Sequence, residues 1–493
     1  MSFNMINLFV PYITIFILTL QGGLLAQNNL SQKLYDNYSK FKFESLENKR
    51  FSHSDLMTAL KQFEKSKLIE ISTAGYSVEG REIKLIKIGS GKTNIMAWSQ
   101  MHGDESTATM ALLDFFNFLE TENESSPLIK EMLKKITLYI IPMLNPDGTE
   151  RFTRRNEIDI DLNRDALRLQ FPESKILKKI QEETNPKFSF NLHDQSTRYT
   201  VGNSYKVATI SFLAPAFNYE KDINEVRENS MKLISQLTKN LEEFIPGHIA
   251  KYSDEFEPRA FGDNFVKWGS SLVLIESGGW KNNYEKSFLR KLNFIALVSG
   301  FESIANESYK NESIDIYNNI PENQKRLFDL LLRNVTIEKN NQTYIVDLGI
   351  NQNEVSTSDK RNFYFSGEID DIGDLSTFYG FEELDCNGLT IDTALVYPTI
   401  FENYNSVKNF DISKILANGY SFIEVDSLNL TERFSEVPIN LILTGKFKKQ
   451  NISIGKNANF RLLKDGVLKF ICVNGFLFDV NSEKNNIQNG LVY

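Results

Sequence analysis

Hydrophobic residues follow two different periods over the first three hundred positions of the chain. Short and mostly apolar runs predict strands at 82–88, 94–98, 136–141, 188–192, 207–213 and 271–275. Apolar positions spaced three and four residues apart predict helices at 108–119, 224–244 and 284–304. Strands that alternate with helices predict an α/β fold, in which helices cover both faces of a sheet.

The pattern changes after about residue 308. One short helix is predicted over Asn323–Leu332, and many short strand-like runs follow, separated by clusters of Asp, Asn, Gly and Ser. A chain of 493 residues is also long for one domain. We therefore expect an N-terminal segment over 1–26, an α/β domain over 27–307 and a C-terminal, mainly β accessory domain over 308–493.

The first residues are apolar and carry no charge before Lys33. The apolar run ends in small residues near Ala26, a plausible cleavage site, and predicts a secretory signal peptide over 1–26, although no Lys or Arg precedes the run. We therefore expect a secreted or periplasmic protein. The competing interpretation is an uncleaved membrane anchor, because Phe9–Leu25 is nearly long enough to span a bilayer.

The amino-acid composition argues against some classes of binding partner and against a fold held by many disulfides. The formal net charge is -9 and no block of Lys and Arg occurs, which argues against nucleic acid or an anionic membrane surface as the main partner. The two cysteines, Cys386 and Cys472, exclude a disulfide framework. One bridge between them in an oxidising compartment and two free thiols both remain open.

Four residues with metal-binding or acid–base chemistry follow predicted strands. His102 and Glu105, in the sequence His-Gly-Asp-Glu, come directly after the strand at 94–98, and His193 ends the strand at 188–192. Two histidines and a carboxylate with one open position form a ligand set of hydrolytic zinc. Glu276 ends the strand at 271–275, where a carboxylate suits a general base. Asp194 is placed to orient His193.

Each of these features has an ordinary explanation when it is taken alone. A His and a Glu three residues apart often lie on the surface, and a histidine in a strand often bonds to the backbone. Asn145-Pro-Asp-Gly148 by itself predicts a turn. An arginine such as Arg154 usually contacts solvent, but one that faces a metal site can stabilise an oxyanion or hold a carboxylate.

Together, the order and spacing of these motifs resemble the zinc carboxypeptidase family, the carboxypeptidase A-like metallopeptidases, over residues 66–304. The resemblance implies a mixed central sheet flanked by helices. It also implies one Zn²⁺ per chain, held by His102, Glu105 and His193, and a general base at Glu276.

The same resemblance implies roles for four further residues. Arg154 would hold the oxyanion, and Asn163 and Arg164, in the sequence Asp161-Leu-Asn-Arg, would hold the terminal carboxylate of a peptide or peptide-like substrate. The family also has a tyrosine on a mobile loop. Tyr252 is the candidate here, although it lies earlier than the family pattern places it. Asp194 departs from the Ser of the digestive enzymes and indicates a distinct subgroup.

These observations predict a secreted zinc metallocarboxypeptidase that hydrolyses C-terminal amide bonds with a zinc-activated water. One alternative is a zinc amidase or deacylase that acts on cell-wall peptides or other non-protein amides. A second, from a different class, is a non-catalytic binding protein on a peptidase scaffold. The presence of Arg154 and Glu276 beside all three predicted ligands disfavours this second alternative.

Overall fold

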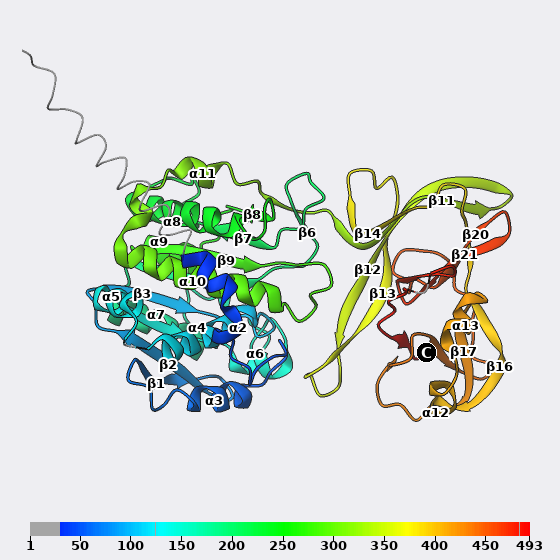
Figure 1. Cartoon of the computed structure of the whole chain (residues 1–493), viewed down its shortest axis with the longest axis horizontal. Coiled ribbons are helices and arrows are strands. Elements are labelled where there is room, and N and C mark those ends of the chain that lie inside the picture. Colours follow the sequence, from blue (N-terminus) through cyan, green and yellow to red (C-terminus); the bar gives the residue numbers. More distant parts are fainter. Residues whose placement is uncertain (1–29, 124, 483) are drawn as a thin grey trace, which may run out of the picture. The chain divides into compact units, whose positions relative to one another are not determined.

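The computed structural model describes residues 30–123, 125–482 and 484–493 (Figure 1). The predicted signal peptide over 1–26 lies outside the described residues. The chain divides into two compact units. The first extends to Thr197 and resumes over Lys206–Asn323, and the second comprises Arg198–Tyr205 and Gln324–Tyr493.

The first unit is built on an eight-stranded sheet with the order β1-β2-β4-β3-β5-β9-β7-β8. Its four central strands β4, β3, β5 and β9 are parallel, whereas β2 and β7 join them in the antiparallel sense. The predicted mixed sheet is therefore confirmed. Its strands are β1 (Ile69–Tyr76), β2 (Glu82–Gly89), β3 (Thr93–Trp98), β4 (Ile136–Ile141), β5 (Phe188–Asp194), β7 (Ile210–Leu213), β8 (Ile249–Lys251) and β9 (Ser271–Ser277).

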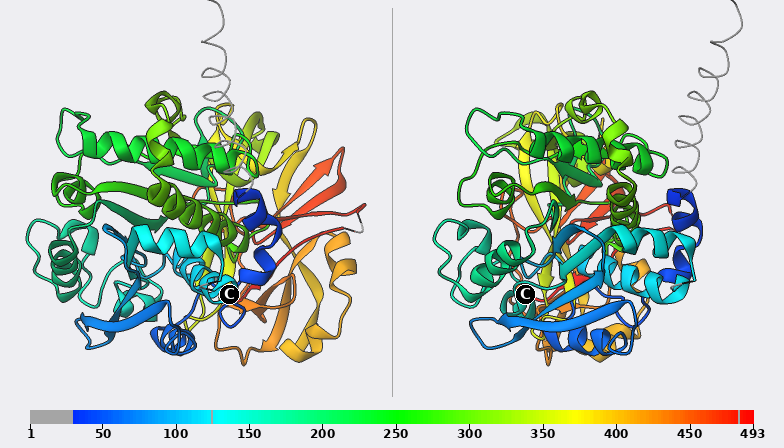
Figure 2. Two further views of the ribbon diagram at one scale, coloured as in Figure 1. Left: turned by 60° about the vertical axis from the view of Figure 1, so that its left-hand side comes forward. Right: turned by 90° about the vertical axis from the view of Figure 1, so that its left-hand side faces the viewer.

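Helices cover both faces of this sheet (Figures 1 and 2). Successive side chains of a strand point to opposite faces. In β5, Phe190 and Leu192 accordingly join the hydrophobic cluster with α4 (Thr107–Glu122), α8 (Glu225–Glu242) and α10 (Ser287–Asn306). On the opposite face, Met96 and Leu272 of the neighbouring strands join a second cluster with α7 (Pro172–Thr184) and α9 (Phe261–Lys267).

Shorter helices complete the first unit. They are α2 (Tyr38–Phe41), α3 (His53–Lys61), α5 (Pro127–Lys135), α6 (Pro146–Arg151), η1 (Leu162–Arg164), η2 (Ser308–Asn311) and α11 (Ile314–Asn318). The hydroxyl of Ser235 in α8 donates to the carbonyl of Ser313 and accepts from the backbone N–H of Tyr317. These bonds tie the segment after α10 to the first unit, so this unit ends later than the domain boundary predicted at 307/308.

The second unit is mainly β, as predicted. Its largest sheet has the order β13-β12-β11-β15-β20-β21-β22 with β14 beside β11, and smaller sheets have the orders β16-β17-β19, β10-β6 and β18-β23. The bounds are β6 (Tyr199–Val201), β10 (Asn323–Lys325), β11 (Leu327–Lys339), β12 (Gln342–Ser356), β13 (Phe363–Gly373), β14 (Tyr379–Asp385), β15 (Thr390–Thr393), β16 (Leu395–Asn403), α12 (Tyr404–Lys408), α13 (Ile412–Ala417), β17 (Tyr420–Ser427), β18 (Phe434–Ser435), β19 (Asn440–Leu443), β20 (Phe460–Lys464), β21 (Val467–Val473), β22 (Phe476–Asp479) and β23 (Gly490–Leu491).

The helix predicted over Asn323–Leu332 is wrong, because this segment forms β10 and the start of β11. Leu330 and Leu332 enter one hydrophobic cluster, whereas Leu331 enters another. A strand buried on both faces has a continuous apolar run, and periodicity cannot distinguish such a run from a buried helix.

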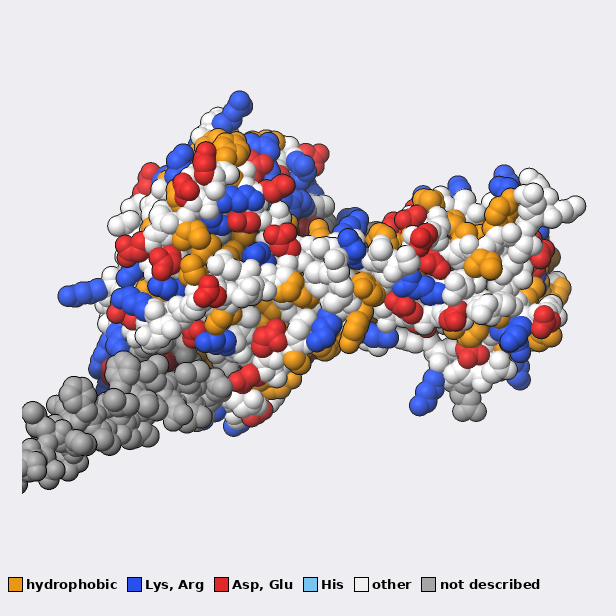
Figure 3. Space-filling model, turned by 90° about the horizontal axis from the view of Figure 1, so that it is seen from above, with side chains coloured by type: hydrophobic (Ala, Val, Ile, Leu, Met, Phe, Trp, Pro, Cys, Tyr) orange, Lys and Arg blue, Asp and Glu red, His pale blue; other side chains and the backbone are white. Residues whose placement is uncertain are grey.

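Three further features bear on the sequence-based expectations. Cys386 and Cys472 are both buried and free. Among the residues that the structure describes, no helix has both the length and the apolar character needed to cross a membrane. Acidic and basic side chains are interspersed over the face in Figure 3, in keeping with the absence of a Lys/Arg block from the sequence.

Candidate metal centre

The parallel strands β3, β5 and β9 carry the candidate site at the edge where they end. β3 leads into the loop with His102 and Glu105, and the last residues of β5 and β9 include His193 and Glu276. β5 lies beside both β3 and β9, and His193 is the register partner of Glu276. Because parallel strands end at the same edge, residues far apart in the sequence meet there.

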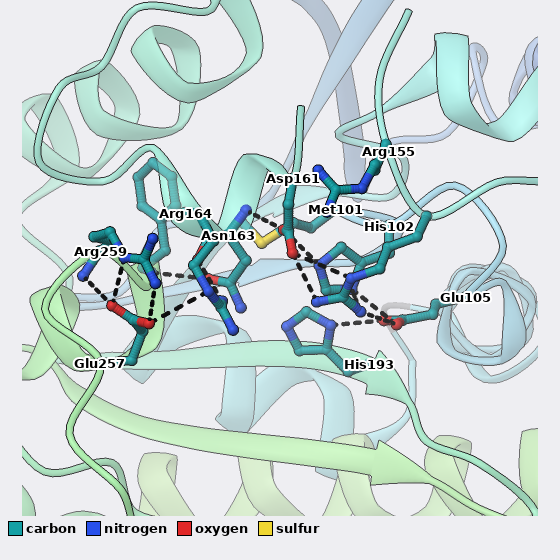
Figure 4. A network of polar contacts seen from close by, with 12 residues as sticks. Met101, His102, Glu105, Arg155, Asp161, Asn163, Arg164, His193, Glu257 and Arg259 are labelled. Carbon is teal, nitrogen blue, oxygen red and sulfur yellow. Dashed lines mark hydrogen bonds and ion pairs between the residues drawn. The ribbon is translucent and has the colours of Figure 1, made fainter. Parts of the chain in front are cut away.

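His102, Glu105 and His193 are buried, and their candidate ligand atoms all lie within 4.8 Å of one another. Nδ1 of His102 is 2.8 Å from Oε1 of Glu105, and Nδ1 of His193 is 2.7 Å from Oε2 of the same carboxylate (Figure 4). The two imidazole rings have their centroids 4.8 Å apart. Two ring nitrogens and a carboxylate thus converge, as the sequence analysis predicted.

Asp161 determines which nitrogen of His102 faces the other ligands. Its Oδ1 lies 3.1 Å from Nε2 of His102, so Nδ1 is the nitrogen left for a metal. The backbone N–H of Asn163 donates to the same oxygen over 2.9 Å. A carboxylate on the far nitrogen of a metal-binding histidine fixes its tautomer and its orientation. No role for Asp161 is predicted from the sequence, although its place beside Asn163 and Arg164 is a usable signal.

The surrounding charges shift the pKa values of the candidate ligands in different directions. Burial disfavours the charged ring of His102, but the Glu105 and Asp161 carboxylates outweigh burial and raise its pKa to about 9. Burial dominates at His193, which has Glu105 as its acidic partner, and lowers its pKa. Burial alone would raise the pKa of Glu105, but the two histidines hold it well below its usual range.

The donor set fits zinc. Structural and catalytic zinc sites use histidine nitrogen and carboxylate oxygen, and catalytic sites keep one position open for water. His102, Glu105 and His193 supply three such donors from buried positions. Zinc binding requires neutral imidazoles and an ionised carboxylate, and a divalent cation itself favours these forms.

Arg154 lies against the candidate ligands. Its Nη1 is 3.1 Å from Nδ1 of His102 and 3.3 Å from Oε1 of Glu105. Its Nε and Nη2 donate to Oδ2 of Asp161 over 3.1 and 3.0 Å. Asp161 therefore orients both a candidate ligand and the arginine that the sequence analysis assigned to the oxyanion.

Glu276 is buried beside His193 in the neighbouring strand. Burial, and the nearby Glu105 and Asp194 carboxylates, raise the pKa of its carboxyl group well above the usual range. A raised pKa means that the carboxyl group holds a proton more strongly, which suits a group that accepts a proton and later donates it.

Asn163 and Arg164 lie in η1, on the other side of His193 from Glu105 (Figure 4). Oδ1 of Asn163 accepts a hydrogen bond from the backbone N–H of Phe261 over 2.9 Å, which orients the side chain and leaves its Nδ2 amide available. Arg164 Nε lies 3.4 Å from Oε2 of Glu257, which also pairs with Arg259. A carboxylate thus already contacts the guanidinium group predicted to hold the substrate carboxylate.

Tyr252 lies one residue beyond β8. Its backbone N–H donates to the carbonyl of Phe212 over 2.9 Å, and its partly buried ring packs in the hydrophobic cluster that contains Leu213, Phe261 and Leu274. The structure therefore places this ring in the packing beside α9. Its role as the mobile tyrosine stays a prediction.

The Asp194 carboxylate does not contact the His193 ring as a hydrogen-bond partner. Its Oδ2 accepts hydrogen bonds from the Thr107 hydroxyl and from the Lys286 ammonium group. Nδ1 of His193 faces Glu105, and its Nε2 is buried without a hydrogen-bond partner among the described residues. Consecutive residues of a strand point to opposite faces, so His193 and Asp194 turn away from each other.

Comparisons with known proteins address this region. Residues 55–196 match the family model described as zinc carboxypeptidase. Carboxypeptidase SOL1 of Arabidopsis thaliana is 33% identical over 141 residues, which cover 27% of this chain and 29% of SOL1. Carboxypeptidase D of Rattus norvegicus is 25% identical over 292 residues, which cover 49% of this chain and 20% of that protein.

The chain therefore spans less than a third of the length of either relative. Among solved structures, a metallo-carboxypeptidase from Burkholderia cenocepacia is 15% identical with a TM-score of 0.42, and the match covers 52% of this chain and 70% of that one. The matched residues 55–196 include His102, Glu105 and His193. The predicted resemblance to the zinc carboxypeptidase family is confirmed by the match of residues 55–196 to that family model.

Proposed function

We propose that this protein is a secreted or periplasmic zinc metallocarboxypeptidase that removes C-terminal residues from peptides. The convergence of His102, Glu105 and His193 within 4.8 Å, in a buried position, is the observation that carries the proposal. Arg154 contacts this set, and Glu276 lies beside His193. Export by the segment 1–26 is part of the proposal.

In the proposed reaction, the metal ligands, Glu276 and Arg154 each have one role. Zn²⁺ held by His102, Glu105 and His193 would activate a water molecule and polarise the scissile carbonyl. Glu276 accepts a proton from the attacking water and delivers it to the leaving amine. Arg154 donates hydrogen bonds to the oxygen on which negative charge develops.

The substrate carboxylate distinguishes an exopeptidase from other amidases. Arg164 and the Nδ2 amide of Asn163 supply the hydrogen-bond donors that a terminal carboxylate needs. Because Glu257 lies 3.4 Å from Arg164, an incoming carboxylate would take its place on the guanidinium group. The proposed substrate is therefore a peptide, or a peptide-like molecule, with a free carboxylate.

The test uses the purified full chain with matched substrates. Peptides with free or amidated C-termini and murein fragments are incubated with and without added zinc, and the products are identified by mass spectrometry. We expect zinc-dependent, stepwise trimming of the free C-termini only. Cleavage confined to murein fragments would favour the amidase, and a zinc-loaded protein that cleaves nothing would favour the binding protein.

Replacing Glu276 with Gln should lower kcat by about 10²- to 10⁴-fold, because the amide cannot accept the proton of the attacking water. Zinc content should remain at the wild-type level, since Glu276 is not one of the three candidate ligands. Initial rates and metal analysis measure both quantities. Glu183→Gln, on the exposed face of α7, is the matched control. Full activity of Glu276→Gln would contradict the assignment of the base.

A further inference from the structure

Lys286 is a buried lysine near the candidate metal centre that the mechanism does not use. Only 8% of its surface is exposed. Its Nζ lies 3.2 Å from Oδ2 of Asp194 and donates to the carbonyl of Ser277 over 3.0 Å. Lysine is almost never fully buried unless it is paired, so these contacts account for its position.

The two acceptors of Lys286 are the last residues of two neighbouring strands. Asp194 ends β5 directly after His193, and Ser277 ends β9 directly after Glu276. In the sheet, Asp194 is the register partner of Ser277. One ammonium group therefore joins the ends of the strands that carry a candidate ligand and the candidate base.

The same network reaches the loop that carries the other ligands. The Thr107 hydroxyl donates to Oδ2 of Asp194 over 2.7 Å, and Thr107 lies two residues after Glu105. The backbone N–H of Asp194 also lies 3.3 Å from Oε2 of Glu105. Asp194 thus connects the start of α4 with the ends of β5 and β9.

The Asp194 carboxylate depends on Lys286 for its charge balance. Its Oδ1 is buried and has no hydrogen-bond partner among the described residues. A buried carboxylate without a compensating cation is strongly unfavourable. Loss of Lys286 would leave this negative charge without its cation, near the candidate base Glu276, whose pKa Asp194 already raises.

The contacts of Lys286 differ from those of a purely structural ion pair in the same unit. Arg290 and Asp114 form such a pair, and Arg290 also donates to the backbone carbonyls of Phe43 and Leu46. That pair fixes the first described segment of the chain. Lys286, in contrast, contacts the residues next to His193 and Glu276. Such outer contacts orient metal ligands and commonly affect metal affinity and activity.

We propose that Lys286 is a positioning residue, which holds Asp194 and the Ser277 carbonyl so that His193 and Glu276 keep their orientation toward the metal. This inference rests on the proposed function, because it assigns Lys286 to the same metal centre. No proton transfer by Lys286 is involved. Its ammonium group acts as a fixed donor between two strand ends.

The test compares full-length Lys286→Met, Lys286→Arg and wild type, with Lys239→Met as a control that removes an ion pair on α8. Zinc affinity is measured by competition with a chromogenic chelator, and kcat and KM are measured at saturating zinc. For Lys286→Met we expect zinc affinity weaker by about 10- to 100-fold. We also expect kcat lower by at least about tenfold, with KM changed by less than about twofold. Lys286→Arg should recover most of both losses.

Lys286→Met with the zinc affinity and kcat of Lys239→Met would overturn the proposal. If Lys286→Met does not fold, Thr107→Val takes its place in the test. This substitution removes another hydrogen bond to Asp194 and changes the side-chain volume very little. It should shift zinc affinity in the same direction, and an unchanged affinity would also overturn the proposal. A wild type that binds zinc but cleaves nothing contradicts the proposed function alone, because the zinc competition still tests Lys286.

Discussion

Buried carboxyl groups of the first unit differ in pKa according to their partners. Glu105 and Asp161 face histidine or arginine side chains, which outweigh burial and lower their pKa values. Asp104 and Asp263 are shifted mainly by burial, and their pKa values rise to about 6 and about 7. The direction of each shift thus depends on whether burial or the cationic partners have the larger effect.

Asp263 in α9 gives the first unit a pH-dependent stability term. Its pKa is about 7 in the folded chain against an ordinary value of 3.8, so the folded state binds more protons between these values. Stability from this group is present at low pH and is lost as the pH rises toward 7. Relative to Asp263→Asn, wild type should lose about 1 kcal/mol per pH unit in this window.

Urea unfolding of wild type and Asp263→Asn at pH 5, 6, 7 and 8 measures this difference. The variant keeps an acceptor for the backbone N–H of Glu257, which lies 3.0 Å from Oδ1 of Asp263. The difference in unfolding free energy should grow up to about pH 7 and then level off. A difference that stays constant from pH 5 to pH 8 would show that Asp263 is not protonated in the folded chain.

At the scale of elements, the loop after β3 and the start of α6 interlock through backbone contacts. Asn145 accepts from the N–H of Gly148 as the cap of α6, and its own backbone N–H donates to the carbonyl of Gln100. A Cβ atom on Gly103 would lie 2.0 Å from the backbone carbon of Gly148. The segment Asn145-Pro-Asp-Gly148, where the sequence alone predicts a turn, forms the N-cap and first residues of α6, and the loop with the candidate ligands packs against it.

Gly103→Ala should destabilise the first unit by about 1–3 kcal/mol, because the new methyl group meets backbone that must move. It should also weaken zinc binding, since Gly103 lies between His102 and Glu105. Gly262→Ala in α9 is the matched control: its nearest contact would be 3.5 Å, so it should be neutral or slightly stabilising. Equal unfolding midpoints for the two variants would contradict this account.

The sequence predicts elements and their ends better than contacts between them. His102, Glu105, His193 and Glu276 could be grouped because each follows an apolar run, and strand ends meet at one edge. The role of Asp161 required the fold, since fifty-nine residues separate it from His102. Lys286 was not predicted either, because an isolated lysine before a helix has no pattern that distinguishes it from a surface residue.

At the scale of the whole molecule, the candidate metal centre lies within one unit. His102, Glu105 and His193, with Arg154 and Glu276, all belong to the first unit. The second unit contributes sheets and hydrophobic clusters of its own. The helix wrongly predicted over Asn323–Leu332 falls where the chain passes from one unit to the other. The pairing of β11 with β12 and β14 cannot be predicted from the local periodicity of hydrophobic residues.

This separation predicts where zinc stabilises the chain. Zinc at about 100 times its Kd should stabilise the first unit by about 2.7 kcal/mol, because the ligands bind it only in the folded state. Hydrogen exchange of the full chain, with zinc or with a chelator, measures the effect by segment. Exchange should slow around 99–107 and 188–194, which carry the ligands, and stay unchanged in β12 and β13. Equal slowing in both units, or none in either, would contradict a metal centre built from His102, Glu105 and His193.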